Sequence, residues 1–434
     1  MKFKIALKLL LLLNFTLLFA CGGGGSAARD DGGNGANTTP APDDSLEDIR
    51  PVLESTYSDV IKGCALADTT AELCTLSTLP LLGMEAENPS INDIMTRVLV
   101  SHDWMGTRFE ALLAEYPPSM LQLFKGLTAI VIDDDIRPAH YRSETGAIYL
   151  DPFYLWTNNE EKITINPKED YRSSYSDPLS FRAWGRYLKN GDYAFSYGAL
   201  DDEEPRSMQD TVLISARLLI HELAHVNDFL PPSSYDNINR NYLVLQAIQS
   251  LVDGRLSDRL SEYSPLHSDL LEDLAKVMFH GTTASFTQKY MTATEVGEEF
   301  ETDAAADAYS YSNQFEDLAM LFEVILMKYY WDLDYQVAFV EPTGAEYYCD
   351  DYIIGWGAYG WIGDTDVKNR ALFVTNELTP ELDLSMFYQE LAAPQLNQSG
   401  SNWCIASTSA GLSKPNNVSQ RMPINPRDFE RRPH

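Results

Sequence analysis

Apolar residues recur at helical spacing through much of the chain between positions 45 and 118. They stand three and four positions apart in Ile91, Ile94, Met95, Val98 and Leu99, and Phe109, Leu112 and Leu113 follow with the same period. This spacing aligns apolar side chains on one face of a helix. We therefore predict a mainly helical N-terminal region over residues 45–125.

Two short apolar runs that follow have the pattern of strands. Residues 129–132 are followed by three aspartates, and residues 146–150 are followed by an Asp-Pro pair. Turn-forming residues bound both runs, as is typical of short strands. The pattern predicts a small mixed or antiparallel sheet.

A long helix is predicted over residues 207–230, where apolar residues keep a helical period until Pro231 and Pro232 end it. More helices are predicted between residues 240 and 330. The glycines and aromatic residues of 355–361 predict short strands and loops in an irregular C-terminal extension over residues 336–434. The expected fold class is α+β, mainly helical, with its central unit over residues 126–335.

The first twenty residues have the pattern of an export signal. Three lysines precede a short apolar run over residues 9–20, and that run is too short for a helical membrane span of about twenty residues. It ends in Leu18-Phe19-Ala20-Cys21, which resembles the lipobox of bacterial lipoproteins. The resemblance implies a signal peptide over residues 1–20 and lipidation of Cys21, for example with palmitate. An ordinary secretory leader is the alternative.

Residues 21–44 are rich in glycine, asparagine, threonine and proline and show no apolar periodicity. Such a composition predicts a flexible tether that holds the folded part away from a membrane. We expect a lipid-anchored protein of the cell envelope. Gly22, rather than aspartate, follows the lipobox cysteine, which favours the outer membrane in the lipoprotein family and leaves the leaflet and the orientation open.

The formal net charge is −32 at neutral pH. A field of this sign repels nucleic acid and anionic lipid, so nucleic acid is not an expected partner. The charge does not identify a substrate, and no pattern in the sequence predicts the oligomeric state.

Four cysteines follow the lipobox, an even number in an exported chain. Disulfides are therefore plausible, and each would add about 2 to 4 kcal/mol of stability. Of three connectivities we favour Cys64 with Cys74 and Cys349 with Cys404, because each pair closes a local segment. A structural zinc site is the rival, but no C-x-x-C spacing supports it.

The predicted long helix contains His221-Glu222-Leu223-Ala224-His225. A spacing of four places both imidazoles on one helical face, where they can share a tetrahedral zinc ion, with Glu222 as general base. The alternative is a pair of packed, hydrogen-bonded histidines in the core. A zinc peptidase also requires a third protein ligand and an open fourth position.

Glu316 is the candidate third ligand. Residues 309–319 resemble the glutamate helix of the gluzincin family, in particular that of the anthrax lethal factor catalytic domain and its bacterial relatives. In that pattern a tyrosine stands seven residues before the ligand, with a Ser or Thr and then Asn between them, and here Tyr309, Ser312 and Asn313 occupy these places. We expect Ser312 to cap the helix. Glu316 could also be an exposed first-turn glutamate that complements the helix dipole.

The resemblance implies that Tyr309 donates a hydrogen bond to the tetrahedral oxyanion, and Tyr311 is the competing choice for this role. Other acids lie within reach in the sequence and are alternatives to Glu316. They are Glu295, Glu298, Glu299, Glu301 and Asp303.

The chain departs from the family pattern at Met320, where relatives often carry an acid that hydrogen-bonds a zinc histidine. Asp228, three residues after His225 as in the family, and Glu323, two helical turns after Glu316, are the candidates for that supporting role. The interval between His225 and Glu316, about ninety residues, implies a helical insertion.

These patterns together predict a zinc metallopeptidase, a hydrolase with one Zn²⁺ and a protein or peptide substrate, built on a zincin-like unit over residues 126–335. Zincins pair an extended substrate with an edge strand, and residues 146–150 are the candidate, although they could equally form an internal strand. A non-catalytic surface-binding or adhesion lipoprotein with a vestigial zinc site is one rival, motivated by the aromatic residues of 347–361. A zinc amidase that acts on the cell wall is the other.

Overall fold

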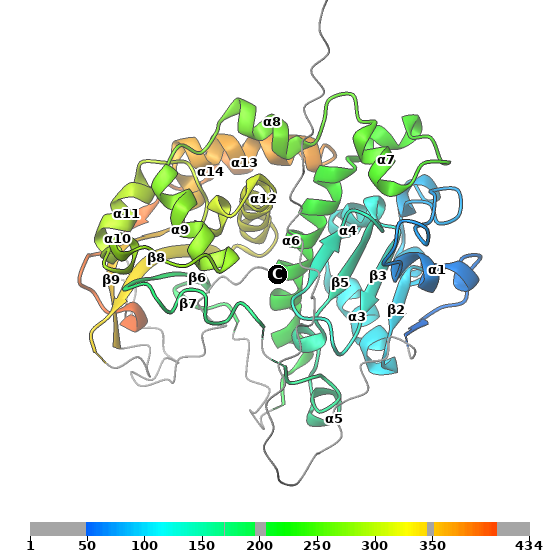
Figure 1. Cartoon of the computed structure of the whole chain (residues 1–434), viewed down its shortest axis with the longest axis horizontal. Coiled ribbons are helices and arrows are strands. Elements are labelled where there is room, and N and C mark those ends of the chain that lie inside the picture. The colour runs from blue at the N-terminus through cyan, green and yellow to red at the C-terminus, as the bar shows by residue number, and fades with distance from the viewer. Residues whose placement is uncertain (1–48, 169, 196–204, 345–350, 406–434) are drawn as a thin grey trace, which may run out of the picture. The chain divides into compact units, whose positions relative to one another are not determined.

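The computed structural model describes residues 49–168, 170–195, 205–344 and 351–405 (Figure 1). The described residues all belong to one compact unit. The predicted signal peptide, Cys21 and the tether lie outside the described residues. The fold is of the mixed α+β class with two small sheets, in agreement with the expected class but with one sheet more.

The first sheet is mixed. Its strands, in the order β1-β2-β3-β5-β4, are β1 Arg50–Pro51, β2 Val98–Val100, β3 Ala129–Ile132, β5 Ala147–Leu150 and β4 His140–Arg142. The pairs β2–β3 and β3–β5 are parallel, and β1 and β4 add antiparallel edges. Both predicted strand runs are therefore present as β3 and β5. Because β5 lies between β3 and β4, residues 147–150 form an internal strand, which is the second of the two alternatives left open by the sequence, and they are not the substrate-binding edge.

The helical reading of residues 98 and 99 is also wrong. The helix α2, Ile91–Met95, ends there, and Val98 to Val100 form strand β2. All three β2 residues are buried, and the β-branched valines suit a strand that is covered on both faces. A five-residue helix followed by a buried strand reproduces helical spacing by chance. The N-terminal region thus supplies two strands of the sheet in addition to helices.

The second sheet is antiparallel throughout. Its strands, in the order β10-β9-β8-β6-β7, are β10 Gln395–Leu396, β9 Tyr352–Tyr359, β8 Asp334–Pro342, β6 Arg182–Lys189 and β7 Asp192–Tyr193. The long strands β8 and β9 correct the prediction of an irregular C-terminal extension. Trp356 and Ala358 of β9 belong to the same hydrophobic core as the central helices, so this region is an integral part of the fold.

Helices fill the remainder of the described chain. The α-helices not yet named are α1 Ser58–Ala65, α3 Asp103–Glu115, α4 Pro118–Leu121, α5 Asn159–Lys162, α6 Met208–Phe229, α7 Val244–Gln249, α8 Leu256–Tyr263, α9 Asp269–His280, α10 Phe286–Lys289, α11 Ala293–Glu301, α12 Gln314–Trp331, α13 Thr365–Leu378 and α14 Ser385–Glu390. Short 3-10 helices are η2 Leu82–Met84, η3 Gln122–Gly126, η4 Pro152–Tyr154, η5 Pro232–Asn237, η6 Ala308–Tyr311, η8 Trp361–Gly363 and η9 Trp403–Ile405. No helix within these described ranges is long and apolar enough to cross a membrane.

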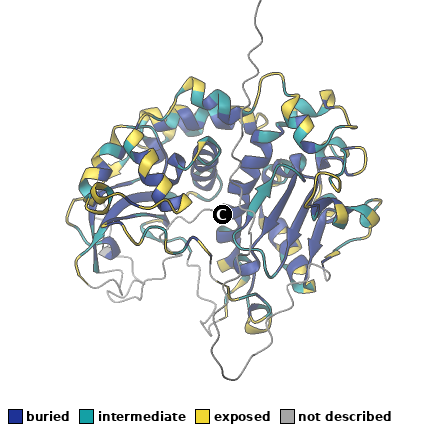
Figure 2. Cartoon of the chain, viewed as in Figure 1, coloured by how far each residue is buried: buried dark blue, intermediate teal, exposed yellow. Residues whose placement is uncertain are grey.

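Helix α6 lies at the centre of the compact unit, between the first sheet and the helices that cover the second sheet (Figure 1). It begins with a capping box in which Ser207 and Asp210 exchange hydrogen bonds, and it ends at Phe229, two residues before Pro231 and within one residue of the predicted end. Most of its residues are buried, and it is dark blue over much of its length in Figure 2. Its closest helical partner is α12. Functional side chains on α6 are therefore held on a rigid element.

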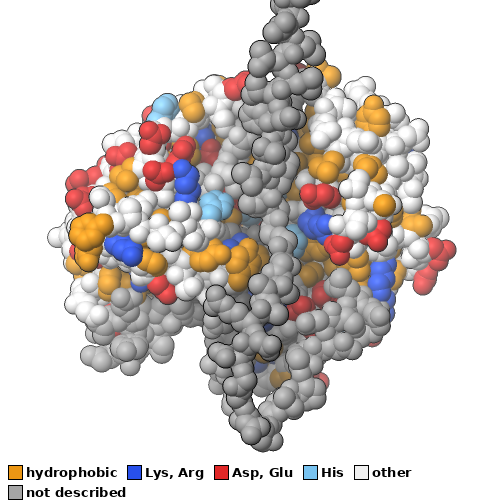
Figure 3. Space-filling view, viewed as in Figure 1, with side chains coloured by type: hydrophobic (Ala, Val, Ile, Leu, Met, Phe, Trp, Pro, Cys, Tyr) orange, Lys and Arg blue, Asp and Glu red, His pale blue; other side chains and the backbone are white. Residues whose placement is uncertain are grey.

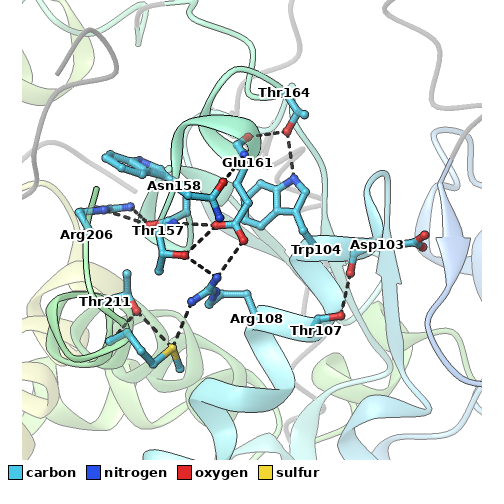
Figure 4. Close-up of polar contacts among 12 residues, drawn as sticks. Asp103, Trp104, Thr107, Arg108, Thr157, Asn158, Glu161, Thr164, Arg206 and Thr211 are labelled. Atoms are coloured by element: carbon cyan, nitrogen blue, oxygen red, sulfur yellow. Dashed lines mark hydrogen bonds and ion pairs between the residues drawn. The ribbon is translucent and has the colours of Figure 1, made fainter. Parts of the chain in front are cut away.

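A polar network fixes the start of α6 (Figure 4). Arg108 of α3 donates to Thr157 and to the Glu161 carboxylate at 2.9 Å. Arg206, just before the helix, donates to the main-chain carbonyls of Phe153 and Trp156. The first turn of α6 is thereby tied to α3 and to the loop that follows the first sheet.

Disulfide bonding follows the local pairing where the structure describes it. Cys64 and Cys74 are bonded to each other. Cys404 is also disulfide-bonded, and Cys349 lies outside the described residues, so the second pairing stays a prediction.

Red acidic and blue basic side chains are interspersed on the described part of the face in Figure 3.

Candidate metal centre

The two histidines of the predicted motif lie one turn apart on α6, with ring centroids 5.0 Å apart. His221 and Glu222 are each 1% exposed, and His225 is 9% exposed. Because α6 is buried against α12, the imidazoles face α12 and not bulk solvent. The three side chains are thus almost fully buried, and His225 is the most exposed of them.

Glu316 meets both histidines from the first turn of α12. Its Oε2 atom lies 3.0 Å from Nε2 of His221 and 3.4 Å from Nε2 of His225. The carboxylate therefore points into the centre of the fold, which disfavours the alternative of an exposed first-turn glutamate. The structure brings together all three predicted ligands, although about ninety residues separate Glu316 from the motif.

Asn313, rather than Ser312, caps α12. The Asn313 side chain accepts the N–H groups of Phe315 and Glu316 at 2.9 and 3.0 Å, whereas the Ser312 hydroxyl contacts His280. Both residue types favour the cap position, so spacing alone could not separate them. The cap directly fixes the backbone of Glu316. On the following residue, Asp317 forms a buried ion pair with Arg370 of α13, which holds the same turn from its other side.

Glu323 supports His221. Its Oε2 lies 3.1 Å from Nδ1 of His221, while its Oε1 accepts hydrogen bonds from Tyr187 at 2.6 Å and from Arg217 at 3.2 Å. Glu323 is fully buried and follows Glu316 by two turns of α12, so both side chains lie on the same side of the helix. Carboxylates in this position orient a ligating histidine and fix which ring nitrogen faces the metal. Here Nδ1 is engaged, so Nε2 faces Glu316.

Asp228 differs from Glu323. Its Oδ1 accepts the Ser257 N–H at 2.7 Å, and its Oδ2 has no hydrogen-bond partner. Among the described contacts it makes no hydrogen bond with His225, although the His225 charge lowers its pKa. Burial is the larger effect and raises the pKa of Asp228 to about 6. Asp228 therefore lies beside the centre but forms no hydrogen bond with a candidate ligand among the described contacts, whereas Glu323 does.

The electrostatics of the three candidate ligands are those of a preformed ion site. Burial alone would raise the pKa of Glu316, but the His225 charge and hydrogen bonds from both histidines hold it far below its ordinary value. Burial alone would lower the pKa of His221, yet its hydrogen bonds to Glu316 and Glu323 raise it.

Glu222 is the unpartnered group of the site. Neither of its carboxylate oxygens has a hydrogen-bond partner, although both are buried. Burial raises the pKa of Glu222 to about 7. The charge of His225 opposes this shift, and the charge of Glu316 adds to it. A buried carboxyl without partners is uncommon in a folded core and indicates a position that a ligand or water completes.

Tyr309, not Tyr311, faces the centre. The Tyr309 ring stacks on His221 with centroids 6.2 Å apart, and burial together with the Glu316 carboxylate raises its pKa well above 10.0. The Tyr311 hydroxyl donates to Asp303 at 3.1 Å instead. The structure therefore separates two tyrosines that the sequence left as competitors.

The other acids once considered as ligands are mostly engaged elsewhere. Glu295 completes a capping box, Glu299 accepts from Ser268 and Glu301 from Trp356, and Asp303 accepts the N–H groups of His267 and Ser268. Within the described ranges, His221, His225 and Glu316 are the group found to fit a metal ion, with one ligand atom from each lying within 4.8 Å of the others.

Distances and donors of this group fit a metal. A tetrahedral ion with bonds of about 2.1 Å separates its ligand atoms by about 3.4 Å, close to the 3.0 and 3.4 Å between Glu316 and the histidines. The orphaned Glu222 carboxylate lies next to this group, where an ion would leave a position for water. The residues present can therefore hold a metal ion, and the fit does not by itself identify which one.

Three residues near the centre escaped the sequence analysis. Arg217, one turn before His221, is a buried cation next to the apolar run Leu218–Ile220 of α6, and a cation at such a position is a signal that could have revealed it. Tyr187 reaches the site from β6, whose pairing no local pattern predicts. Arg172, which lies in a loop, affects the pKa of both Glu222 and Tyr309.

Comparison of the chain with protein-family models, with curated proteins and with solved structures finds no match.

Proposed function

We propose that this protein is a zinc-dependent metallopeptidase with a zincin-like catalytic unit of the gluzincin type. The observation that carries the proposal is the buried group of His221, His225 and Glu316 beside the unpartnered carboxylate of Glu222. Two imidazoles and one carboxylate form a donor set that zinc uses in catalytic sites, where it keeps an open position. Export as a lipoprotein to the cell envelope remains part of the proposal and rests on the N-terminal sequence.

Zinc bound by these three side chains would polarise the scissile carbonyl and lower the pKa of an attacking water toward about 7. Glu222 accepts the proton of that water and passes it to the leaving amine. The absence of competing hydrogen bonds leaves both of its oxygens available.

Tyr309 donates its phenolic hydrogen to the developing oxyanion. Its raised pKa keeps the phenol protonated at neutral pH, as a donor must be. Stacking on His221 holds the ring beside the ligand group. Glu323, backed by Arg217, keeps Nδ1 of His221 occupied so that Nε2 serves as the ligand atom.

Strand β4 is the proposed substrate-binding edge, in place of β5. It is the outer strand of the first sheet and packs against α6. An unpaired strand edge offers main-chain donors and acceptors to an extended peptide. A peptide that pairs with residues 140–142 would pass along the active-site helix.

Turnover by matched variants tests the proposal. The wild-type protein is expected to cleave casein, and Glu222→Gln should lower the rate by more than about 1,000-fold while zinc stays bound. Glu298→Gln, an acid on α11 outside the ligand group, serves as the matched control and should leave the rate unchanged. Cleavage of peptidoglycan but not casein would support a cell-wall amidase, and bound zinc without any turnover would support a binding protein; either result contradicts the proposal.

A further inference from the structure

Two tyrosines of the second sheet lie directly opposite one another. Tyr187 of β6 pairs with Tyr335 of β8, and their ring centroids are 4.9 Å apart. The two strands lie side by side in Figure 1. Both residues belong to the hydrophobic core that also contains the buried residues of α6 and α12. The rings of this tyrosine pair therefore lie on the sheet face that packs against the central helices.

Each member of the tyrosine pair donates a hydrogen bond to a buried carboxylate. The Tyr187 hydroxyl donates to Oε1 of Glu323 at 2.6 Å, and the Tyr335 hydroxyl donates to Oδ2 of Asp307 at 2.7 Å. Glu323 is 0% exposed and Asp307 is 3% exposed. Hydrogen bonds from a hydroxyl to an ionised carboxylate are short and strong, and a buried carboxylate that loses one is costly. The pair thus holds two acidic side chains in fixed places.

The two carboxylates lead to two different groups of the candidate centre. Oε2 of Glu323 lies 3.1 Å from Nδ1 of His221. Oδ1 of Asp307 accepts the main-chain N–H of Tyr309 at 2.8 Å, and Asp307 thereby caps η6. We call these two hydrogen-bonded chains the Glu323 arm and the Asp307 arm. The first ends at a candidate metal ligand, and the second ends at the backbone of the candidate oxyanion donor.

Gly185 provides the space that the Asp307 arm occupies. It stands two residues before Tyr187 on β6, so it lies on the same face of the sheet, diagonally opposite Tyr335. A Cβ atom at position 185 would lie 1.8 Å from the Tyr335 hydroxyl oxygen. A glycine inside a strand weakens the strand and often marks a place that another group approaches closely. Here the approaching group is the hydroxyl that donates to Asp307.

The ring of Tyr309 is held from two further directions. It stacks on His221 with centroids 6.2 Å apart, and Phe279 of α9 packs edge-on against it at 4.9 Å. These contacts fix the ring, whereas Asp307 fixes the backbone from which the ring projects. Donors that are held in place before charge develops stabilise a transition state without reorganisation.

We propose that Asp307 and Tyr335 are positioning residues for Tyr309, and that the tyrosine pair aligns this oxyanion donor with His221. The inference rests on the proposed peptidase function, in which Tyr309 contacts the substrate and the other two residues do not. Because the members of the pair stand at opposed positions of adjacent strands, the pairing of β6 with β8 sets the separation of the two arms.

Removal of one hydroxyl from each arm tests the inference. Tyr335→Phe should lower kcat for fluorescently labelled casein by about 10-fold and change KM by less than about threefold, because an oxyanion donor acts in the transition state. Its zinc affinity, measured against a competing chelator, should stay within about threefold of wild type. Tyr187→Phe removes the same group from the Glu323 arm and should lower the zinc affinity by about 10-fold.

Tyr359→Phe is the matched control. Tyr359 of β9 also donates its hydroxyl to an aspartate, Asp334, but it pairs with Gln336 and so lies on the opposite sheet face from Tyr335. Its kcat and zinc affinity should equal those of wild type. A loss of zinc affinity in Tyr335→Phe as large as its loss of kcat would overturn the separation of the two arms.

A double-mutant cycle separates positioning from a general weakening of the fold. Tyr309→Phe should lower kcat by about 100-fold, and adding Tyr335→Phe should lower it by less than about twofold further, because the hydroxyl to be positioned is already absent. Asp307→Asn keeps one acceptor oxygen and should retain more of the rate than Asp307→Ala. Independent, multiplied losses in the double variant would assign Tyr335 a merely structural role.

Hydrogen exchange tests the inference independently of turnover. Because the Tyr309 N–H donates to Asp307, Tyr335→Phe should speed amide exchange in η6 by about 10-fold and leave α6 unchanged. Faster exchange confined to η6 supports the inference even where wild type cleaves no casein, a result that rejects only the peptidase proposal. Cleavage by wild type with unchanged kcat and exchange in Tyr335→Phe supports the peptidase and overturns the role of Asp307 and Tyr335.

Discussion

The two histidines of the centre have different surroundings. His221 is 1% exposed, and Glu323, Arg217 and Tyr187 form a continuous hydrogen-bonded chain behind it. His225 is 9% exposed, and the nearby Asp228 accepts the Ser257 main-chain N–H with one carboxylate oxygen and has no hydrogen-bond partner for the other. We call the His221 side the braced side, because it is fully buried and supported by hydrogen bonds. We call the His225 side the softer side, because it is more exposed and less supported. Under the proposed function, the braced side would orient the ligand group and the less supported side would accommodate substrate.

The largest effect is expected from breaking the braced side. Glu323→Gln removes the charge that Arg217 pairs with in the interior, and a broken buried pair costs about 3 to 5 kcal/mol of folding stability. The zinc affinity should also fall by about 10- to 100-fold, because His221 loses its orienting carboxylate. Chemical denaturation and zinc titration against a competing chelator measure both. Unchanged stability and affinity would show that the chain behind His221 has no bracing role.

On the softer side, the contribution of Asp228 to folding stability should depend on pH. Burial raises the pKa of Asp228 to about 6, so the folded metal-free protein binds its proton more tightly than the unfolded chain does. Its contribution to stability is therefore full below about pH 4 and is lost as pH rises through about 6. Relative to wild type, Asp228→Asn should gain about 2 kcal/mol of stability between pH 4 and pH 7.

Denaturation of metal-free protein at both pH values measures this change, and Asp236→Asn on η5 is the matched control. A difference between wild type and Asp228→Asn that does not vary with pH would contradict the raised pKa. The zinc affinity of Asp228→Asn should fall by less than about fivefold, in contrast to the Glu323 variant, because no hydrogen bond to His225 is lost.

Zinc binding should release a proton from the braced side. The carboxylates of Glu316 and Glu323 raise the pKa of His221, so that its ring is protonated over a wider range of pH in the metal-free protein. A metal ligand must be neutral imidazole, and zinc therefore displaces that proton. Calorimetry in buffers of different ionisation enthalpy should show a net release of protons when zinc binds to the wild-type protein. A binding enthalpy that does not vary with the buffer would contradict the assignment.

The smallest effect concerns the cap that positions Glu316. Asn313→Ala removes two hydrogen bonds at the start of α12 and should cost about 1 kcal/mol. Ser312→Ala, at the neighbouring position, should cost no more than about 0.5 kcal/mol of folding stability, because the Ser312 hydroxyl makes an exposed hydrogen bond with the His280 side chain. Thermal denaturation of both variants decides between the two candidate caps, and equal losses would contradict the observed one.

Local patterns predicted those parts of the site that depend on local spacing. The period and the proline stop of α6 place His221, Glu222 and His225, and the segment before Glu316 indicates a ligand glutamate with a tyrosine nearby. Local spacing could not reveal the strand β2, because a short helix and a buried strand together imitate a longer helix. Neither could it reveal that β6 pairs with β8 across about 150 residues, and it is this pairing that brings Tyr187 to Glu323.

The edge strand illustrates the same limit. The apolar run of 147–150 predicts a strand, but a continuous apolar run is typical of a strand buried on both faces, and β5 is such a strand. The true edge, β4, has the mixed sequence His140-Tyr141-Arg142 and no strong strand signal. Which strand lies outside is decided by sheet order, and that information lies in long-range packing.

The zinc content of the purified protein decides whether the three ligands form a metal centre. We expect one zinc per chain by elemental analysis in wild type and in Glu222→Gln, and loss of zinc in His221→Ala, His225→Ala and Glu316→Ala. Each variant should retain the wild-type circular dichroism spectrum, so that loss of metal is separated from loss of fold. Absence of zinc from the wild-type protein after reloading, or its retention in Glu316→Ala, would contradict the proposed centre.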